Sequence, residues 1–103
     1  MSLYTFCENG DIEGVRAALR RGEDVNQIWR HADGISFGNN MGLPLQGAIK
    51  GNHPNIVAFL IQQPGIDMNL KTFANYMAEA CFRGHTSCVV ELKKWESMQN
   101  KEL

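Results

Sequence analysis

Two apolar stripes at helical spacing, separated by a short turn, dominate the middle of this chain of 103 residues. Leu45, Ala48 and Ile49 recur at i, i+3 and i+4 just after Pro44, a residue suited to the first turn of a helix. After the Gly51-Asn52-His53 turn, a second stripe has the same period and consists of Ile56, Val57, Leu60 and Ile61. Neither predicted helix is long enough to be stable alone. Each therefore needs neighbouring helices to pack against.

The same pattern occurs twice more along the chain. Residues 3–26 and 76–95 each contain small residues, a turn with Gly, and then a stripe of Ile, Val and Leu. The residues that follow the three turns, Asp11, His53 and His85, are 42 and 32 positions apart. One such repeat cannot bury its own apolar face, whereas about three stacked repeats can. The small residues expected where helix backbones approach closely are Cys7, Ala48, Ala80 and Cys81.

These linked motifs resemble the ankyrin repeat, whose period is about 33 residues. Residues 43–46, Leu-Pro-Leu-Gln, are similar to the family's Thr-Pro-Leu-His, and Asn52-His53 and Gly84-His85 are similar to its Gly-His turn. Residues 22–26 and 65–69 are similar to its Gly-Ala-Asp-Val-Asn exit. The resemblance implies an all-α fold, a solenoid of antiparallel helix pairs with hairpin or finger loops.

The resemblance also implies a single domain over residues 1–103. Repeat 1 is expected over about 2–26, a long finger insertion over 27–42, repeat 2 over about 43–69 and repeat 3 over about 70–98. The 18 positions from Asn26 to Pro44 are about twice the gap usual in the family. Only seven positions separate Asn69 from Tyr76, so a short second finger is expected there.

Charge and composition exclude several classes of function. The net charge of −1 and pI of about 6.3 provide no broad basic field, so nucleic acid is not an expected partner. No apolar run approaches the roughly 20 residues of a membrane span, and no secretory signal is evident. Three cysteines, an odd number, favour reduced thiols and a location in the cytoplasm or nucleus.

One alternative is a metal site at Cys81, His85 and Cys88, whose spacing could place three ligands on adjacent turns. A fourth ligand is missing, and the Gly84-His85 turn interrupts the helix that would align them. The structural interpretation, with both cysteines in the core and His85 bonded to backbone, is preferred. Cys7 with a histidine lacks an orienting motif for nucleophilic catalysis. We therefore expect no catalytic residue, no metal and no cofactor.

The long insertion is the first candidate for partner binding, because loops on a rigid scaffold commonly carry recognition. Trp and Arg are also enriched at binding hot spots. Its candidate residues are Trp29, Arg30, His31, Phe37, Asn39 and Asn40. The alternative is that Ile28, Trp29 and Phe37 fold inward as a small core under the loop.

The resemblance places a second candidate surface on the concave side, at the positions just before each turn. Its candidate residues are Lys50, Phe82 and Arg83, to which the short second finger adds Lys71 and Phe73. For Phe82 the alternative is a half-buried filler, and Trp95 is expected to cap the last apolar stripe.

The sequence thus favours a non-catalytic protein-protein interaction module, an adaptor or inhibitor that grips a protein partner with its fingers and inner helices. A monomer is expected. The alternative is a self-assembling unit that dimerises or stacks through a poorly capped end or through the apolar finger.

Overall fold

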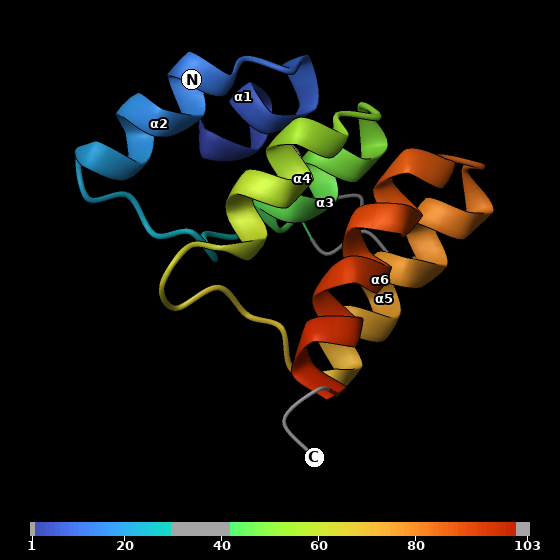
Figure 1. Cartoon of the computed structure of the whole chain (residues 1–103). Helices are drawn as coiled ribbons and strands as arrows, with labels where there is room; N and C mark the ends of the chain where they lie inside the picture. Colours follow the sequence, from blue (N-terminus) through green and yellow to red (C-terminus); the bar gives the residue numbers. More distant parts are fainter. Residues whose placement is uncertain (1, 30–41, 101–103) are drawn as a thin grey trace.

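The computed structural model describes residues 2–29 and 42–100, which form six α-helices and no strand. The helices are α1 (Leu3–Asn9), α2 (Ile12–Arg20), α3 (Pro44–Lys50), α4 (Pro54–Ile61), α5 (Leu70–Phe82) and α6 (Thr86–Asn100). Consecutive helices form three hairpins that lie side by side in chain order (Figure 1), called here hairpin 1 (α1–α2), hairpin 2 (α3–α4) and hairpin 3 (α5–α6). The predicted all-α class is confirmed.

The starts of the helices follow from local side-chain chemistry. Ser2 and Asp11 cap α1 and α2, because their side-chain oxygens accept hydrogen bonds from the backbone N–H groups of Thr5 and Gly14. Pro44 and Pro54 are the first residues of α3 and α4, where a missing N–H costs nothing. The two central helices predicted from the apolar stripes are therefore confirmed.

The turns inside the three hairpins share one backbone conformation. Gly10, Asn52 and Gly84 have φ angles of 78°, 61° and 70°, all in the left-handed region. Glycine and asparagine tolerate this region better than other residues do. The turn residues recognised in the sequence thus have the same geometry at all three positions.

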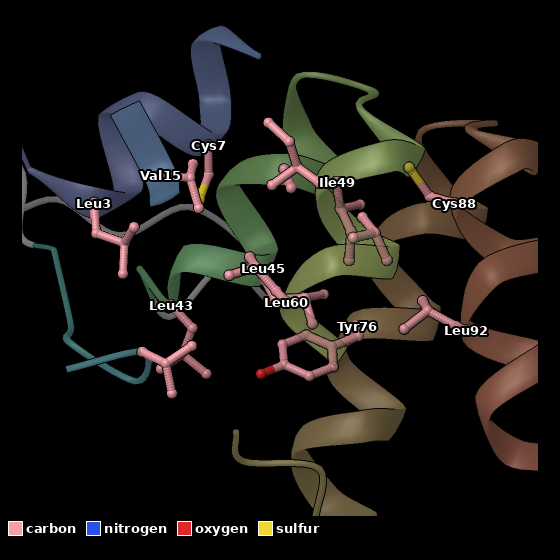
Figure 2. Close-up of a cluster of buried hydrophobic side chains, with 14 of the residues drawn as sticks. Leu3, Cys7, Val15, Leu43, Leu45, Ile49, Leu60, Tyr76, Cys88 and Leu92 are labelled. Atoms are coloured by element: carbon pink, nitrogen blue, oxygen red, sulfur yellow. The ribbon is translucent and has the colours of Figure 1, made fainter. Parts of the chain in front are cut away.

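Hairpins 1 and 2 pack closely because α3 carries small residues. A Cβ atom at Gly47 would lie 2.9 Å from the carbonyl oxygen of Tyr4, and one at Gly51 would collide with the carbonyl oxygen of Glu8. The buried core then continues through all three hairpins (Figure 2). Its members include Leu3, Cys7, Val15, Leu45, Ile49, Leu60, Tyr76, Cys88 and Leu92.

The exits of hairpins 1 and 2 are joined by Asn26. Its Nδ2 donates to the carbonyl oxygen of Gly65 at 2.7 Å, and its Oδ1 accepts from the N–H of Asp67 at 2.9 Å. The side chain thereby ties two loops that are about 40 residues apart in sequence into one edge of the molecule.

Two sequence predictions about hairpin 3 are wrong. The expected second finger is replaced by helix, because the side chain of Asn69 accepts the N–H of Thr72 and starts α5 at Leu70. Cys81, expected in the core, is exposed, whereas its neighbour Ala80 is fully buried, because α5 belongs to the last hairpin of the described row and packs against other helices on only part of its surface. Trp95 does cover the core as predicted, with its ring 5.2 Å from that of Phe73.

No helix in the described part of the chain combines the length and apolar character that crossing a bilayer requires.

Candidate functional site

The base of the long insertion is fixed to hairpin 1. The ring of Trp29 stacks on that of Tyr4, with centroids 4.6 Å apart and planes 5° apart, and Tyr4 is almost fully buried. The N–H of Trp29 donates to the carbonyl oxygen of Gly42 at 2.8 Å. Trp29 and Gly42, the described residues that flank segment 30–41, are therefore joined to each other beside α1.

The two described apolar residues of the insertion differ in burial, so the alternative of an inward-folded small core holds for one of them and not for the other. Trp29 is half-buried and packs inward, whereas Ile28 is 53% exposed. The remaining candidates of the insertion, Arg30, His31, Phe37, Asn39 and Asn40, lie outside the described residues.

A row of charged residues runs across the C-terminal ends of α1, α3 and α5. Lys50 lies 3.8 Å from Glu8, and Arg83 donates to Glu79 at 3.3 Å. Burial raises the pKa of Glu79, and the positive charges of Arg83 and Lys50 and the ring of His85 oppose that shift. The positive charge of Lys50 therefore forms an ion pair with Glu8 in hairpin 1 and lowers the pKa of Glu79 in hairpin 3.

This charged row and the base of the insertion share one side of the molecule. Tyr4 and Glu8 are four residues apart on α1, and residues at that spacing lie on the same helix face. Trp29, which covers Tyr4, thus lies at the edge of the face that carries Glu8 and Lys50. We call Trp29, Glu8, Lys50 and Arg83 the inner face.

The other candidate residues are placed differently from one another. Phe82 lies at the end of α5 next to Arg83 and is 93% exposed, so it is no half-buried filler. Lys71 is exposed on α5. Phe73 is only 7% exposed and packs under Trp95, so its selection as a surface residue is wrong. The error has the same cause as the missing second finger, because residues 70–75 are helix.

The histidines of the turns have structural roles. The ring of His53 hydrogen-bonds through Nε2 to the carbonyl oxygen of Glu8 at 3.0 Å, and that of His85 through Nδ1 to the carbonyl oxygen of Ile49 at 2.7 Å. Because a carbonyl only accepts, each of these ring nitrogens carries the proton. Each histidine thereby joins its own hairpin to the preceding one.

The two buried thiols are poor nucleophiles. Burial raises the pKa of Cys7 to about 12. Burial, assisted by the charge of Glu91, raises that of Cys88 to about 11. Since the thiolate is the reactive form, both thiols stay protonated near neutral pH.

The geometry does not assemble the alternative metal site of Cys81, His85 and Cys88. Cys88 is buried with its Sγ directed at Asn52, Cys81 is exposed, and a ring nitrogen of His85 is engaged with a backbone carbonyl. Across residues 2–29 and 42–100, three or more His, Cys, Asp or Glu side chains nowhere gather as metal ligands would.

A hollow of about 330 Å³ between α2 and α4 was missed by the sequence reasoning. It is lined by Arg16, Leu19, Arg20, Phe59 and Gln63. The guanidinium of Arg16 lies 5.5 Å from the centre of the Phe59 ring. Two arginines four residues apart on α2 were the available signal, but the sequence could not place Phe59 beside them.

Comparison with known proteins adds no identification. No family model, no curated protein and no solved structure matches this chain.

Proposed function

We propose that this chain is a non-catalytic protein-protein interaction module built from three ankyrin-type hairpins, with the inner face and the long insertion as its binding surface. The observation that carries the proposal is the fixed base of the insertion. Trp29 is held by Tyr4 and Gly42 on the same side of the molecule as the ion-paired row of Glu8 and Lys50. A loop held on a rigid scaffold beside a charged row is suited to recognising another protein.

The repeated geometry of the three hairpins supports the ankyrin interpretation. The left-handed turn residue recurs at 10, 52 and 84, and the histidine after the turn bonds to the preceding hairpin in hairpins 2 and 3. The roles of four described groups support a non-catalytic function, because Cys7 and Cys88 are buried in the core and His53 and His85 form hydrogen bonds between hairpins.

The inner face also indicates what kind of contact a partner would make. Lys50 and Arg83 are each about one-third exposed and already ion-paired, so they can exchange their partners for acidic groups of an incoming protein. Phe82, almost fully exposed at the end of the row, offers an apolar anchor beside those charges.

The test compares the wild type with two variants in affinity capture from the organism's extract, quantified by mass spectrometry. The first variant replaces residues 30–41 with Asn-Gly. A turn of two residues can join Trp29 to Gly42, because a hydrogen bond already connects their backbones across the gap. The second variant is Lys50→Glu, which reverses the charge in the middle of the row. Arg20→Glu on α2, outside the inner face, is the matched control.

We expect a protein that is captured by the wild type and the control but lost from both inner-face variants. Thermal unfolding and circular dichroism of all four proteins verify that the hairpins remain folded. Equal capture of the same proteins by the wild type and by both folded inner-face variants would contradict the proposal.

A further inference from the structure

One face of α5 exposes apolar residues along its whole length. Leu70 is 86% exposed and Phe82 is 93% exposed, and Ala74, Ala78 and Cys81 between them are exposed as well. At 3.6 residues per turn these side chains cover about a third of the helix circumference. Lys71 is the one charged residue within that arc. We call Leu70, Ala74, Ala78 and Phe82 the α5 stripe.

The order of large and small residues in the stripe is self-complementary. Leu70 and Phe82 are each six positions from the middle of the stripe, and Ala74 and Ala78 are each two positions from it. When two copies of α5 cross antiparallel about a two-fold axis, Leu70 of one copy meets Phe82 of the other, and Ala74 meets Ala78. An isologous interface requires this kind of matching, in which each contact occurs twice.

We propose that the chain forms a two-fold symmetric dimer in which the α5 stripe of one copy packs against the α5 stripe of a second copy. The two alanines at the crossing point let the helix backbones approach closely, and the large residues at the ends fill the space where the helices diverge. Residues spaced by four form the ridge that packs in the commonest class of helix crossing, at about −50°. The proposal shares no residue with the inner face, although Phe82 of the stripe lies next to Arg83 and is also the apolar anchor suggested for a partner.

The size of the stripe indicates a weak dimer. Covering Phe82, Leu70 and the small residues between them removes roughly 500 Å² from each copy, or about 1,000 Å² in total, at the lower end of specific interfaces. The location is open to a second copy, because α5 belongs to the last hairpin of the described row (Figure 1) and the four residues of its stripe are all exposed.

Charge does not oppose this pairing. In the antiparallel arrangement the two Lys71 residues flank the stripe at opposite ends of the crossing, about ten residues apart along the helix. That separation is roughly 15 Å, greater than the screening length of about 10 Å in 0.1 M salt. A homodimer therefore buries the apolar stripe without bringing the two ammonium groups together.

The first test is sedimentation velocity over low to high micromolar concentration. We expect the wild type to shift from monomer to dimer as its concentration rises. Leu70→Glu should raise the dissociation constant at least about tenfold, because it places a charge in the contact. Val90→Glu and Met98→Glu are matched controls, since both residues are exposed and apolar but lie on α6. A monomer at every concentration, or a dimer that Leu70→Glu leaves intact, would overturn the proposal.

The second test fixes the direction of pairing. In a Cys81→Ser background, the thiol of Leu70→Cys in one copy should lie opposite that of Phe82→Cys in the other, and oxidation of an equimolar mixture of the two variants with diamide should give a disulfide-linked dimer. Two copies of Leu70→Cys place their thiols about 18 Å apart along the helix, too far for a disulfide, so this variant alone should not cross-link. Efficient cross-linking of Leu70→Cys alone would overturn the antiparallel arrangement.

The tests of the two proposals are separable. Leu70→Glu leaves Trp29, Glu8 and Lys50 unchanged, and Lys50→Glu leaves the α5 stripe unchanged. Loss of the dimer with retained partner capture would point to the stripe alone, and the reverse result to the inner face alone.

Discussion

Hairpins 2 and 3 carry the same sequence pattern but differ in how deeply it is buried. Ile49 and Cys81 occupy matching positions four residues before the histidine of each turn, and Ile49 is fully buried whereas Cys81 is exposed. In the second helices, Val57 is fully buried but its counterpart Val89 is only partly buried.

The difference arises from neighbours and not from the helices themselves. Hairpin 2 lies between two others, whereas hairpin 3 has a neighbour on one side in the described structure. Each hairpin thus buries one set of residues against its predecessor and a second set only where a successor is present. In a row of this kind the stability of a hairpin depends on the contacts at its two sides.

The largest expected effect tests this comparison directly. Ile49→Ala should lower the free energy of unfolding by about 2–5 kcal/mol, because it opens a cavity between hairpins 2 and 3. Cys81→Ala, at the matching position of hairpin 3, should change it by less than about 0.5 kcal/mol. Urea titrations followed by circular dichroism measure both, at a protein concentration low enough to keep the chain monomeric. Comparable losses in the two variants would show that position 81 is covered in solution.

Substitutions of Asn26 and Asn69, in the loops that follow hairpins 1 and 2, should give the next largest change in the free energy of unfolding. Asn26→Ala removes two hydrogen bonds between hairpins 1 and 2 and should cost about 1–3 kcal/mol. Asn69→Ala, at the corresponding exit of hairpin 2, removes only the cap of α5 and should cost about 1 kcal/mol.

Amide hydrogen exchange distinguishes these two roles. Exchange in Asn26→Ala should quicken at Asp67, whose N–H loses its acceptor, and exchange in Asn69→Ala should quicken at Thr72. A faster exchange spread equally over all hairpins in both variants would contradict these separate roles.

Alkaline pH should destabilise the fold through its buried thiols, Cys7 in hairpin 1 and Cys88 in hairpin 3. In the unfolded chain Cys7 ionises near pH 9.0, but burial raises its pKa to about 12 in the folded protein. Between these values the unfolded state binds fewer protons than the folded state, so stability falls as pH rises, by up to about 1.4 kcal/mol per pH unit for this thiol. Cys88 adds to the same trend up to about pH 11.

Denaturation series from pH 8 upward, taken as far as the protein stays reversible, measure this slope. Cys7→Ala should make the slope shallower, and Cys81→Ala, which alters an exposed thiol, should leave it unchanged. Equal slopes in the wild type and Cys7→Ala would mean that Cys7 is not protected from ionisation in the folded state.

Local sequence chemistry was sufficient to predict the two central helices but not the start of α5 or the burial of individual residues. Pro44, the turn at Asn52 and the apolar spacing of the central stretch predicted α3 and α4 correctly, because caps, turns and helical period act within a few residues. The exposure of Cys81 could not be predicted in the same way, since it depends on which hairpins lie beside α5, and the described residues place only hairpin 2 there. Cys81 was predicted in the core as a small residue at a close helix approach, and that type of residue does not by itself reveal whether a further helix covers it.

In the candidate site, too, local features could be predicted from the sequence, whereas contacts between different elements could not. The half-buried stacking of Trp29 on Tyr4 joins side chains from two different elements, and no periodicity specifies that contact. Phe73 was selected because its segment was interpreted as a loop, although Asn69 followed by Thr72 is also a helix-start signal. Phe82 was selected because the resemblance places the residues before each turn on the surface, and it is exposed; Lys71 is exposed although it was selected through the same mistaken finger as Phe73.

The smallest expected effect separates contacts between hairpins from contacts within one. Glu8 and Lys50 join hairpins 1 and 2 at 3.8 Å, whereas Glu91 and Lys94 lie one turn apart on α6 at 3.3 Å. Double-mutant cycles with Gln at both acidic and Met at both basic positions should give coupling energies of about 0.2–1 kcal/mol for each pair, because partly exposed ion pairs are screened by water and salt. The pair between hairpins should nevertheless have the larger coupling, since both of its side chains are about one-third exposed, whereas that of Lys94 is 65% exposed. A larger coupling for the pair on α6, or no decrease of either coupling in high salt, would show that Lys50 does not link the first two hairpins electrostatically.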